Sequence, residues 1–520
     1  MAANYERRLY KEYELLLTDK EAFQAEYKLL KKEHQMLQKS YQLLQNELRS
    51  QEKMAAELAE RDAENKALQK EILRLIALMN TDGTNSGIPT SKTPIFKKKV
   101  IPNSREKSGK KIGGQPGHPK KKLEAFADHE VTETELHQPE ICPFCGEQVE
   151  GTGETIDKDE LDYEVVVIKR RHRFVVCKCG KCGHKFSEPI PPNLKEDNQY
   201  GSQVRSLALA LMNIGNVSVN KVRKMIYGLS EEEIDPSEGY IIKQQRKAAK
   251  ELMLFWEELK KKCLTLETVY WDDTVIDINT RRGCLRFYGD ETTALYAAHL
   301  HKDKVGLDDD GILKLLPKET VVMHDHNKVN YNKEYSFSNI ECNVHLLRDL
   351  QKTTDNLQHQ WSGKLKELLE KTNKERNGAI ERNEESFDDA YVKAFFEEFD
   401  RIILEGMEEN KEDYNKYYGK DERTLILRIL QYKDNYLSWV VNFKIPFSNN
   451  LSERGLRGAK SKMKISGQFQ SEETAMHYAV IKSYIETCYR NGINETEALV
   501  RLCAGKPYTV KEICSPVSGE

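Results

Sequence analysis

The chain has 520 residues, of which 32% are charged, yet its formal net charge at pH 7 is only −3 and its mean hydropathy is −0.70. At about 100 to 200 residues per domain, this length predicts three or four domains. No apolar run approaches the roughly 18 residues that cross a bilayer, and the N-terminus lacks the apolar core of a signal peptide. We therefore expect a helix-rich cytoplasmic protein without a membrane span, whose eleven cysteines are thiols or metal ligands.

The first 80 residues, 1–80, are expected to form one long helix. Neither Gly nor Pro occurs between about residues 5 and 80, and apolar or aromatic residues recur in alternating steps of four and three. These residues are Phe23, Tyr27, Leu30, Leu37, Tyr41, Leu44 and Leu48. A seam of this period favours a coiled coil that joins two copies of the chain. Because the seam is interrupted between Gln51 and Arg61, the alternative is an amphipathic helix that folds back on its own protein.

Residues 81–135 are rich in Ser, Gly, Pro and basic side chains, and we interpret them as a tether. Few acidic residues accompany the basic residues of this segment, so its cations are suited to neutralise DNA phosphates without reading the base sequence. The candidates are Lys97, Lys98, Lys99, Lys110 and Lys111. The alternative is a linker that is merely solvated.

Residues 136–195 carry two Cys-x-x-Cys-Gly steps, which are typical of a structural zinc site. Cys142, Cys145, Cys179 and Cys182 can converge on one Zn²⁺, and the glycines that follow allow the tight turns. Cys177 is an alternative ligand to Cys179, and a redox-active cysteine pair is the alternative interpretation of the motif. The β-branched run at 163–177, YEVVVIKRRHRFVVC, predicts a β-hairpin arm.

Residues 196–262 are expected to be helical, in stretches at 202–213, 217–228 and 237–262. Three helices in this order permit a helix-turn-helix DNA-binding segment, and a plain helical connector is the alternative.

Beyond residue 263 the pattern changes from helices to strands. Short, largely apolar runs predict a buried mixed sheet within 263–350. The runs lie at 266–278, 284–291, 293–300 and 319–326. After them we expect a charged helical insertion at 351–440, further helices of the core at 441–490 and a C-terminal tail at 491–520.

Three acids separated in the sequence are the candidate catalytic residues. Asp272 lies within a predicted strand, Asp325 at the end of another and Glu453 at the start of a helix. Buried strands seldom carry carboxylates unless these are paired or bind a cation, and two divalent ions held by such acids catalyse phosphoryl transfer. Hard oxygen ligands suit Mg²⁺ or Mn²⁺. Asp273 is the alternative to Asp272, because successive side chains of a strand face opposite ways.

The helix that begins near Glu453 also carries candidate DNA contacts. Positions 453, 457, 460 and 464 share one helical face, so a metal-binding acid is followed there by cations able to hold phosphates. The candidates on this segment are Asn450, Arg454, Arg457, Lys460, Lys462 and Lys464. The alternative is an ordinary ion pair between Glu453 and Arg457 on a solvated helix.

Taken together, these motifs resemble the bacterial DDE transposases of insertion-sequence family sixty-six. The resemblance is carried by the Gly-Gly-Gln-Pro-Gly-His run that ends at His118, by the two cysteine steps, and by the Asn-Asn-x-x-Glu-Arg segment around Glu453. A further step, Cys342-x-x-His345-x-x-Arg348, matches the family at its cysteine, histidine and arginine. The family's tryptophan after that cysteine is replaced here by Asn343, and an aspartate by Ser448. Nearly the whole chain is covered.

The resemblance implies a multidomain protein of mixed α+β and α/β class. Its parts would be an N-terminal coiled coil, a zinc ribbon-like domain, and an RNase-H-like catalytic core with a helical insertion. It also implies that Asp272, Asp325 and Glu453 are the catalytic acids and hold Mg²⁺ or Mn²⁺, that the cysteines hold Zn²⁺, and that His118 belongs to the DNA-contacting tether. The implied partners are double-stranded DNA at the element ends and target, a second copy of the chain, and accessory proteins encoded by the element, in a nucleoid-associated setting.

Two other functions fit the same residues. One is a catalytically silent, domesticated DNA-binding regulator or architectural protein that keeps the zinc and coiled-coil parts. The other is a metal-dependent nuclease that cuts without transferring strands. Retention of Asp272, Asp325 and Glu453 favours the transposase.

Overall fold

The computed structural model describes residues 2–80, 125–152, 154–191, 194, 196–416 and 418–514. Most of the basic tether is therefore outside the described residues. The candidate DNA contacts that fall there are Lys97, Lys98, Lys99, Lys110, Lys111 and His118. Among the described helices, none is both long and apolar enough to cross a bilayer.

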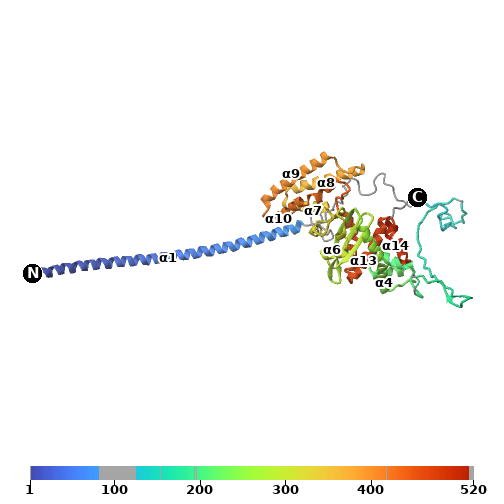
Figure 1. The fold of residues 1–520 in the computed structure, drawn as a ribbon, viewed down its shortest axis with the longest axis horizontal. Coiled ribbons are helices and arrows are strands. Elements are labelled where there is room, and N and C mark those ends of the chain that lie inside the picture. The colour runs from blue at the N-terminus through green and yellow to red at the C-terminus, as the bar shows by residue number, and fades with distance from the viewer. Residues whose placement is uncertain are drawn as a thin grey trace.

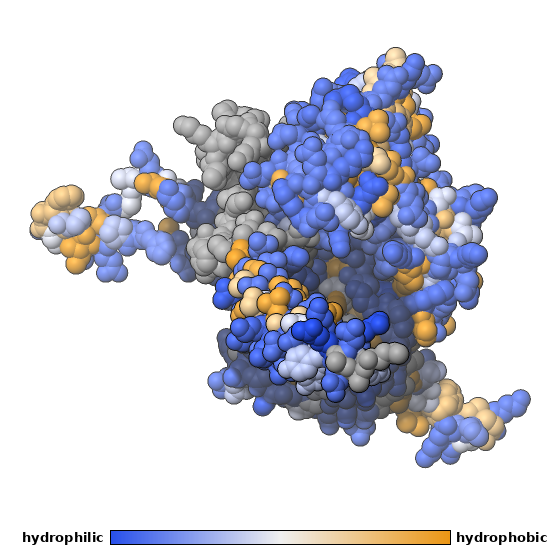
Figure 2. Space-filling model, turned by 90° about the vertical axis from the view of Figure 1, so that its left-hand side faces the viewer, coloured by the Kyte–Doolittle hydropathy of each residue, from blue (hydrophilic) through white to orange (hydrophobic). Residues whose placement is uncertain are grey.

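A single long helix, α1 (Ala2–Asn80), extends away from the folded core (Figure 1). At 1.5 Å per residue it is about 120 Å long. The helix expected from the period of the sequence is thus present. Its seam residues are exposed: Phe23 is 71% exposed, Leu30 64% and Leu37 71%. Figure 2 views the molecule from the N-terminal end of α1, and orange apolar side chains alternate there with blue hydrophilic ones.

The segment between α1 and the core has little regular structure among its described residues. Its two short strands, β1 (Cys177–Lys178) and β2 (Lys185–Phe186), pair antiparallel. The prediction of a β-hairpin arm at 163–177 was wrong, because residues 163–176 lie in no strand. β-Branched residues favour a strand only where a partner strand and a packed face exist. Here the valines lack such a face: Val166 is 74% exposed and Val175 68%.

Four helices precede the sheet, close to the boundaries that the sequence predicted. Ser230 and the following residues separate the second and third helices, and Leu252 interrupts the stretch expected to run unbroken from 237 to 262. Trp256 of the last helix donates its indole N–H to the carbonyl of Tyr296 at 2.9 Å, which ties this layer to the sheet. The helices are α2 (Ser202–Asn213), α3 (Val219–Leu229), α4 (Glu238–Glu251) and α5 (Met253–Cys263).

The core contains a mixed five-stranded sheet with strand order β5-β4-β3-β6-β7. Strands β3, β4 and β5 are antiparallel neighbours, whereas β6 runs parallel to both β3 and β7. The first four strands confirm the four predicted runs, and β7 was not predicted. The strands are β3 (Thr268–Ile278), β4 (Arg281–Gly289), β5 (Ala294–His299), β6 (Val321–His324) and β7 (Ser338–Glu341).

Helices pack on both faces of this sheet. One face, which includes Trp271 and Tyr288, packs on α5 and on the C-terminal helices. The opposite face, which includes Ile276 and Phe287, packs on the helix of Glu453 and on the first part of the next helix. The helices after the insertion are α12 (Asn450–Ser466), α13 (Glu472–Arg490), α14 (Glu495–Cys503) and α15 (Val510–Cys514). Between β5 and β7 lie α6 (Lys304–Asp310) and two short 3-10 turns (Leu313–Leu315 and Lys328–Tyr331).

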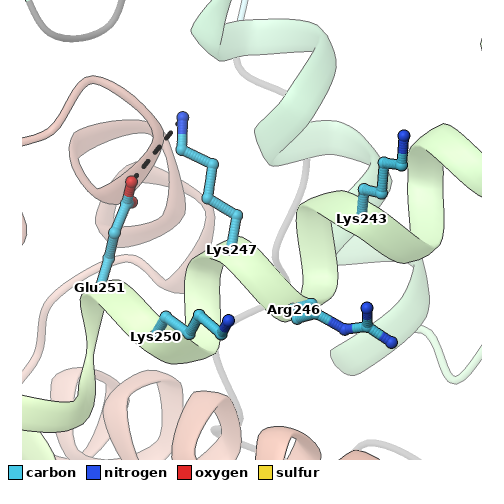
Figure 3. Close-up of a pocket in the computed structure, with 5 residues that line it drawn as sticks. All are labelled: Lys243, Arg246, Lys247, Lys250 and Glu251. Carbon is cyan, nitrogen blue, oxygen red and sulfur yellow. Dashed lines mark ion pairs between the residues drawn. The ribbon is translucent and has the colours of Figure 1, made fainter.

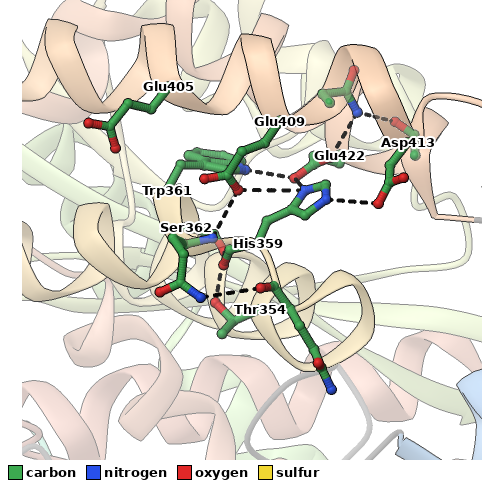
Figure 4. Close-up of polar contacts among 12 residues, drawn as sticks. Thr354, His359, Trp361, Ser362, Glu405, Glu409, Asp413 and Glu422 are labelled. Carbon is green, nitrogen blue, oxygen red and sulfur yellow. Dashed lines mark hydrogen bonds and ion pairs between the residues drawn. The ribbon is translucent and has the colours of Figure 1, made fainter.

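The charged stretch before α12 forms a helical subdomain with its own apolar core (Figure 1, orange). At its centre the fully buried carboxylate of Glu422 accepts the indole N–H of Trp361 at 2.6 Å and contacts His359 Nδ1 at 2.7 Å (Figure 4). Trp361 lies in the first turn of one helix, with His359 as its N-cap residue, and Glu422 lies in another, so the network fixes how these two helices pack. The helices are α7 (Asn343–Leu357), α8 (Gln360–Glu381), α9 (Asp389–Asp413), α10 (Gly419–Gln431) and α11 (Lys433–Val441).

Candidate active site

The topology brings the three predicted acids to one region of the sheet. Asp272 lies in β3, and Asp325 follows β6, the parallel neighbour of β3. Glu453 lies in the first turn of α12, which packs across β3 and β4. Asp272 is opposite Phe287, whose side chain packs on the α12 face of the sheet. The side chain of Asp272 therefore points towards α12.

A buried asparagine fixes the start of α12. The amide of the Asn449 side chain donates to the carbonyl of Trp271 at 2.9 Å, directly beside Asp272. Its backbone N–H contacts Cys342 Sγ at 3.2 Å. Because both contacts are fully buried, the helix that carries Glu453 is anchored to the strand that carries Asp272. Asn449 was noted only as part of the family motif, and no positioning role was predicted for it.

The electrostatics of Asp272 show that the charges of Asp325 and Glu453 reach its carboxylate. Burial raises the pKa of Asp272 to about 7, and the charge of Asp325 is the next largest cause. Asp273 and Glu453 raise it further, while the Asp273 amide opposes the shift. When several carboxyl groups lie close together in a partly desolvated site, their mutual repulsion disfavours ionisation of at least one of them. Such a cluster is stable in its charged form when a cation is added.

Two carboxylate oxygens in this cluster complete no hydrogen bond. Asp325 Oδ1 and Glu453 Oε1 are both buried and make no hydrogen bond. A buried acceptor without a partner costs about 1–3 kcal/mol, so such atoms are rare unless a ligand completes them. Carboxylate oxygens are the ligands that Mg²⁺ and Mn²⁺ prefer. By ligand type, the donor set therefore fits a divalent cation of this kind.

A second group adjoins Asp325. His345 Nδ1 lies 3.0 Å from Asp325 Oδ1, close enough for an ion pair although neither atom completes a well-directed hydrogen bond. Burial opposes the charged imidazole, but the contacts with Asp325 and Cys342 outweigh it and raise the pKa of His345 to about 11. On the other side of the ring, Arg348 Nη1 is 3.3 Å from His345 Nε2. His345 and Arg348 thus support the carboxylate of Asp325.

Cys342 lies beside Asp325 and His345, and the sequence had indicated no role for its thiol. The ligand atoms of Asp325, Cys342 and His345 all lie within 4.8 Å of one another. Among the described residues no other set of three His, Cys, Asp or Glu side chains meets that distance, so the carboxylates of Asp272, Asp325 and Glu453 are spaced more widely than this trio. The spacing Cys-x-x-His was visible in the sequence. What the spacing did not show is that the thiol of Cys342 lies against Asp325.

Asp273, the alternative to Asp272, lies on the other face of β3. Its Oδ1 forms an ion pair with Lys302 Nζ at 2.7 Å. The alternation of side chains along the strand thus places Asp272 with Asp325 and Glu453, and Asp273 with a lysine.

The candidate DNA contacts on α12 divide into two sets. Arg454, Arg457, Lys460 and Lys464 are exposed, and Asn450 is half-buried. Lys462 is half-buried and donates to the carbonyl of Met212 in α2 at 3.3 Å, and burial lowers its pKa. Nine residues after Glu453, at 100° per residue, Lys462 is half a turn away from the acid. Its ammonium group therefore holds α12 against α2.

The two cysteine steps form separate turns. In the first, the Gly146 amide donates to the Cys142 carbonyl at 2.9 Å, and backbone amides of Phe144 and Cys145 lower the pKa of the Cys142 thiol. In the second, the amides of Cys182 and Lys181 lower the pKa of the Cys179 thiol in the same way. Thiolates are the zinc-binding form of cysteine. In the described residues Cys142, Cys145, Cys177, Cys179 and Cys182 do not gather into one cluster, so the shared zinc site remains a prediction.

Gly455 lies where α12 packs closely against the sheet, and its substitution tests how close that packing must be. A Cβ at Gly455 would lie 2.8 Å from the Tyr296 hydroxyl, which is fully buried and donates to the Gly455 carbonyl. We expect Gly455→Ala to destabilise the fold by about 1–3 kcal/mol and to slow cleavage, since Glu453 lies half a turn away. Melting temperature and cleavage rate measure the two effects.

Gly458→Ala, on the same helix, is the matched control. A Cβ there meets only the flexible end of Lys482, at 3.4 Å. This variant should keep full activity and gain up to about 1 kcal/mol from the better helix propensity of alanine. Equal stability of the two variants would contradict the close seating of α12.

Comparison with known proteins identifies the family of the segment that carries these residues. A model of the Transposase IS66 family matches residues 219–477. The matched segment begins in α3, ends in α13 and contains Asp272, Asp325 and Glu453. No curated protein matches the chain. Across residues 219–477, which include the whole acidic cluster, the chain belongs to the IS66 family of transposases.

Proposed function

We propose that this transposase cleaves phosphodiester bonds at the terminal inverted repeats of its element and transfers the freed 3′-hydroxyl ends to target DNA. The observation that carries the proposal is the convergence of Asp325 and Glu453 on the buried Asp272, whose pKa is raised to about 7 by burial first and by the charges of the neighbouring acids second. Two buried carboxylate oxygens in the same cluster, Asp325 Oδ1 and Glu453 Oε1, complete no hydrogen bond and support it further.

In this mechanism Asp272, Asp325 and Glu453 would hold Mg²⁺ or Mn²⁺. When bound, two such ions activate the attacking oxygen and stabilise the leaving oxygen of an in-line displacement. The protein's own side chains do the positioning. His345 holds one face of the Asp325 carboxylate, and Asn449 keeps the first turn of α12, with Glu453, against β3.

The remaining parts of the chain have proposed roles in assembly. Through its exposed seam, α1 would pair two protomers in a coiled coil, so that both element ends are held together. Zn²⁺ would be bound by four cysteine thiolates, and the lowered pKa values of Cys142 and Cys179 support this. The tether would contact DNA phosphates, and accessory proteins of the element could complete the assembly.

A cleavage and joining assay tests the proposal. The full chain is incubated with duplexes that carry the element ends, in Mg²⁺, Mn²⁺ or excess EDTA. We expect nicking in either metal and none in EDTA, and joining to target DNA when pre-cleaved ends are supplied. Cleavage without joining would indicate a nuclease. Binding with neither reaction in both metals would contradict the proposal and indicate a DNA-binding regulator.

A further inference from the structure

Helix α4 carries a basic face outside the catalytic cluster. Lys243, Arg246, Lys247 and Lys250 are all exposed, and at 100° per residue they fall within about 100° of one another around the helix. With Glu251 they line a hollow of about 350 Å³ (Figure 3). The four cations therefore point to one side of α4, and we call these four residues the α4 basic face.

The positive charge of this face is largely uncompensated. Glu251 approaches only Lys247, at 3.8 Å, and the other three cations form no ion pair with any described residue. His477 of α13 faces the same side: burial lowers its pKa, and Arg246 and Lys250 lower it further, against the charge of Glu473. A neutral imidazole does not compete with the cations for an anion. The face thus offers three cations without an ion pair, and a fourth with only a long one, to a polyanionic ligand.

Two half-buried contacts connect the α4 basic face to the helix of Glu453. Lys462 of α12 donates to the carbonyl of Met212 at the end of α2. The next residue, Asn213, exchanges two side-chain hydrogen bonds of 2.9 Å with Gln245, which directly precedes Arg246. The end of α2 therefore lies between the C-terminal half of α12, with its exposed cations, and the middle of α4. The end of α2 thus links the two helices that carry these cations.

We propose that the α4 basic face binds the phosphate backbone of the duplex that enters the active site along α12. The inference rests on the proposed function only in taking DNA as the substrate, and it needs no catalysis. Lysine and arginine neutralise phosphates whatever the base sequence. From Glu453 to Lys462 the helix rises about 14 Å, which equals about four base pairs at 3.4 Å each. The face thus holds DNA that flanks the cleaved position.

A charge-removal variant tests the inference through binding alone. The substitutions are Lys243→Gln, Arg246→Gln, Lys247→Gln and Lys250→Gln. Affinity for a duplex without element sequence is measured in EDTA over a range of salt concentrations. At about 0.9 per phosphate contact, the slope of log K against log salt should become shallower by about 3 to 4. At physiological salt we expect at least about tenfold weaker binding and an unchanged melting temperature, since all four side chains are exposed.

Two companion variants separate the α4 basic face from net charge and from misfolding. The first changes four exposed lysines of the insertion helices to glutamine and should leave the slope unchanged: Lys371, Lys393, Lys411 and Lys420. The second exchanges the three α4 lysines for arginine and should retain binding. An unaltered slope in the α4 variant, or an equal loss in the insertion variant, overturns the inference. If the wild type binds DNA through this face but never cuts it, the proposed function is contradicted while this inference stands.

Discussion

Replacing Asp272 with asparagine is expected to abolish metal-dependent cleavage while raising the melting temperature of the metal-free protein. The carboxylate is held in a cluster of like charges, and its amide analogue removes that repulsion without changing size. Because the amide cannot replace an anionic metal ligand, cleavage should fall by about 10³-fold or more, with DNA binding retained. Gain of stability and loss of activity should therefore appear in the same variant.

The stability gain should depend on pH in a defined direction. The pKa of Asp272 is about 7 in the folded protein and about 3.9 in an unfolded chain. The folded state therefore binds the proton more tightly, so the wild type keeps this contribution below about pH 4 and loses it as the pH rises through 7. Asp272→Asn does not titrate there. Its advantage should be absent near pH 4, grow with pH and level off above about pH 8, at no more than about 4 kcal/mol.

Thermal unfolding with and without Mg²⁺ measures both effects. A cation that binds only the folded state should raise the melting temperature of the wild type and leave that of Asp272→Asn nearly unchanged. Asp277→Asn is the matched control, since Asp277 is an exposed acid of the same strand. A variant that melts below the wild type at pH 8 in EDTA, or one that still cuts, would contradict a shared carboxylate site.

Asp310→Ala should cost more stability than any other single change considered for this core. Asp310 Oδ2 accepts from Arg286 Nη1 at 2.8 Å and from the Tyr288 hydroxyl at 2.7 Å, and all three side chains are buried. Removing the carboxylate leaves the Arg286 guanidinium in the interior without a counter-charge. Breaking a buried pair in this way costs about 3–5 kcal/mol. Denaturant unfolding, followed by the fluorescence of the core tryptophans, measures the loss.

The neighbouring acid supplies the control for Asp310. Asp309 has a 59% exposed side chain and pairs with His299 at 3.3 Å, so Asp309→Ala should cost at most about 1 kcal/mol. Asp310→Asn, which keeps an acceptor oxygen, should fall between the two alanine variants. If Asp310→Ala unfolds at the same denaturant concentration as Asp309→Ala, the buried ion pair does not stabilise the attachment of α6 to the sheet.

Strands with apolar runs could be predicted from the sequence, and the short polar strand could not. β3 and β6 confirm the runs around Asp272 and Asp325, because apolar residues in a buried strand leave a clear pattern. β7 has only four residues, one of them the fully buried Glu341. That carboxylate accepts from the Tyr331 hydroxyl at 2.6 Å and contacts His326 at 2.7 Å. Partners of this kind are set by tertiary packing, which one sequence does not show.

The candidate site could be predicted in its residue types but not in the direction of every side chain. Alternation along β3 required that one of Asp272 and Asp273 face away, yet only the packing of α12 decides which. Lys462 was grouped with the DNA contacts because it follows Glu453 closely. Its angle around the helix places it against α2 instead. Close spacing in the sequence is a weaker guide than helical phase.

The insertion helices impose a delay on synthesis. Asp272 and Asp325 leave the ribosome before α7 to α11, and Glu453 follows only after all five of those helices. At about 5–20 residues per second, the interval from Asp272 to Glu453 lasts about 10 to 40 s. A nascent chain in that interval has a sheet that lacks its last acid, and we expect it to be inert. On the proposed function, half-made copies are therefore not expected to nick DNA during that interval.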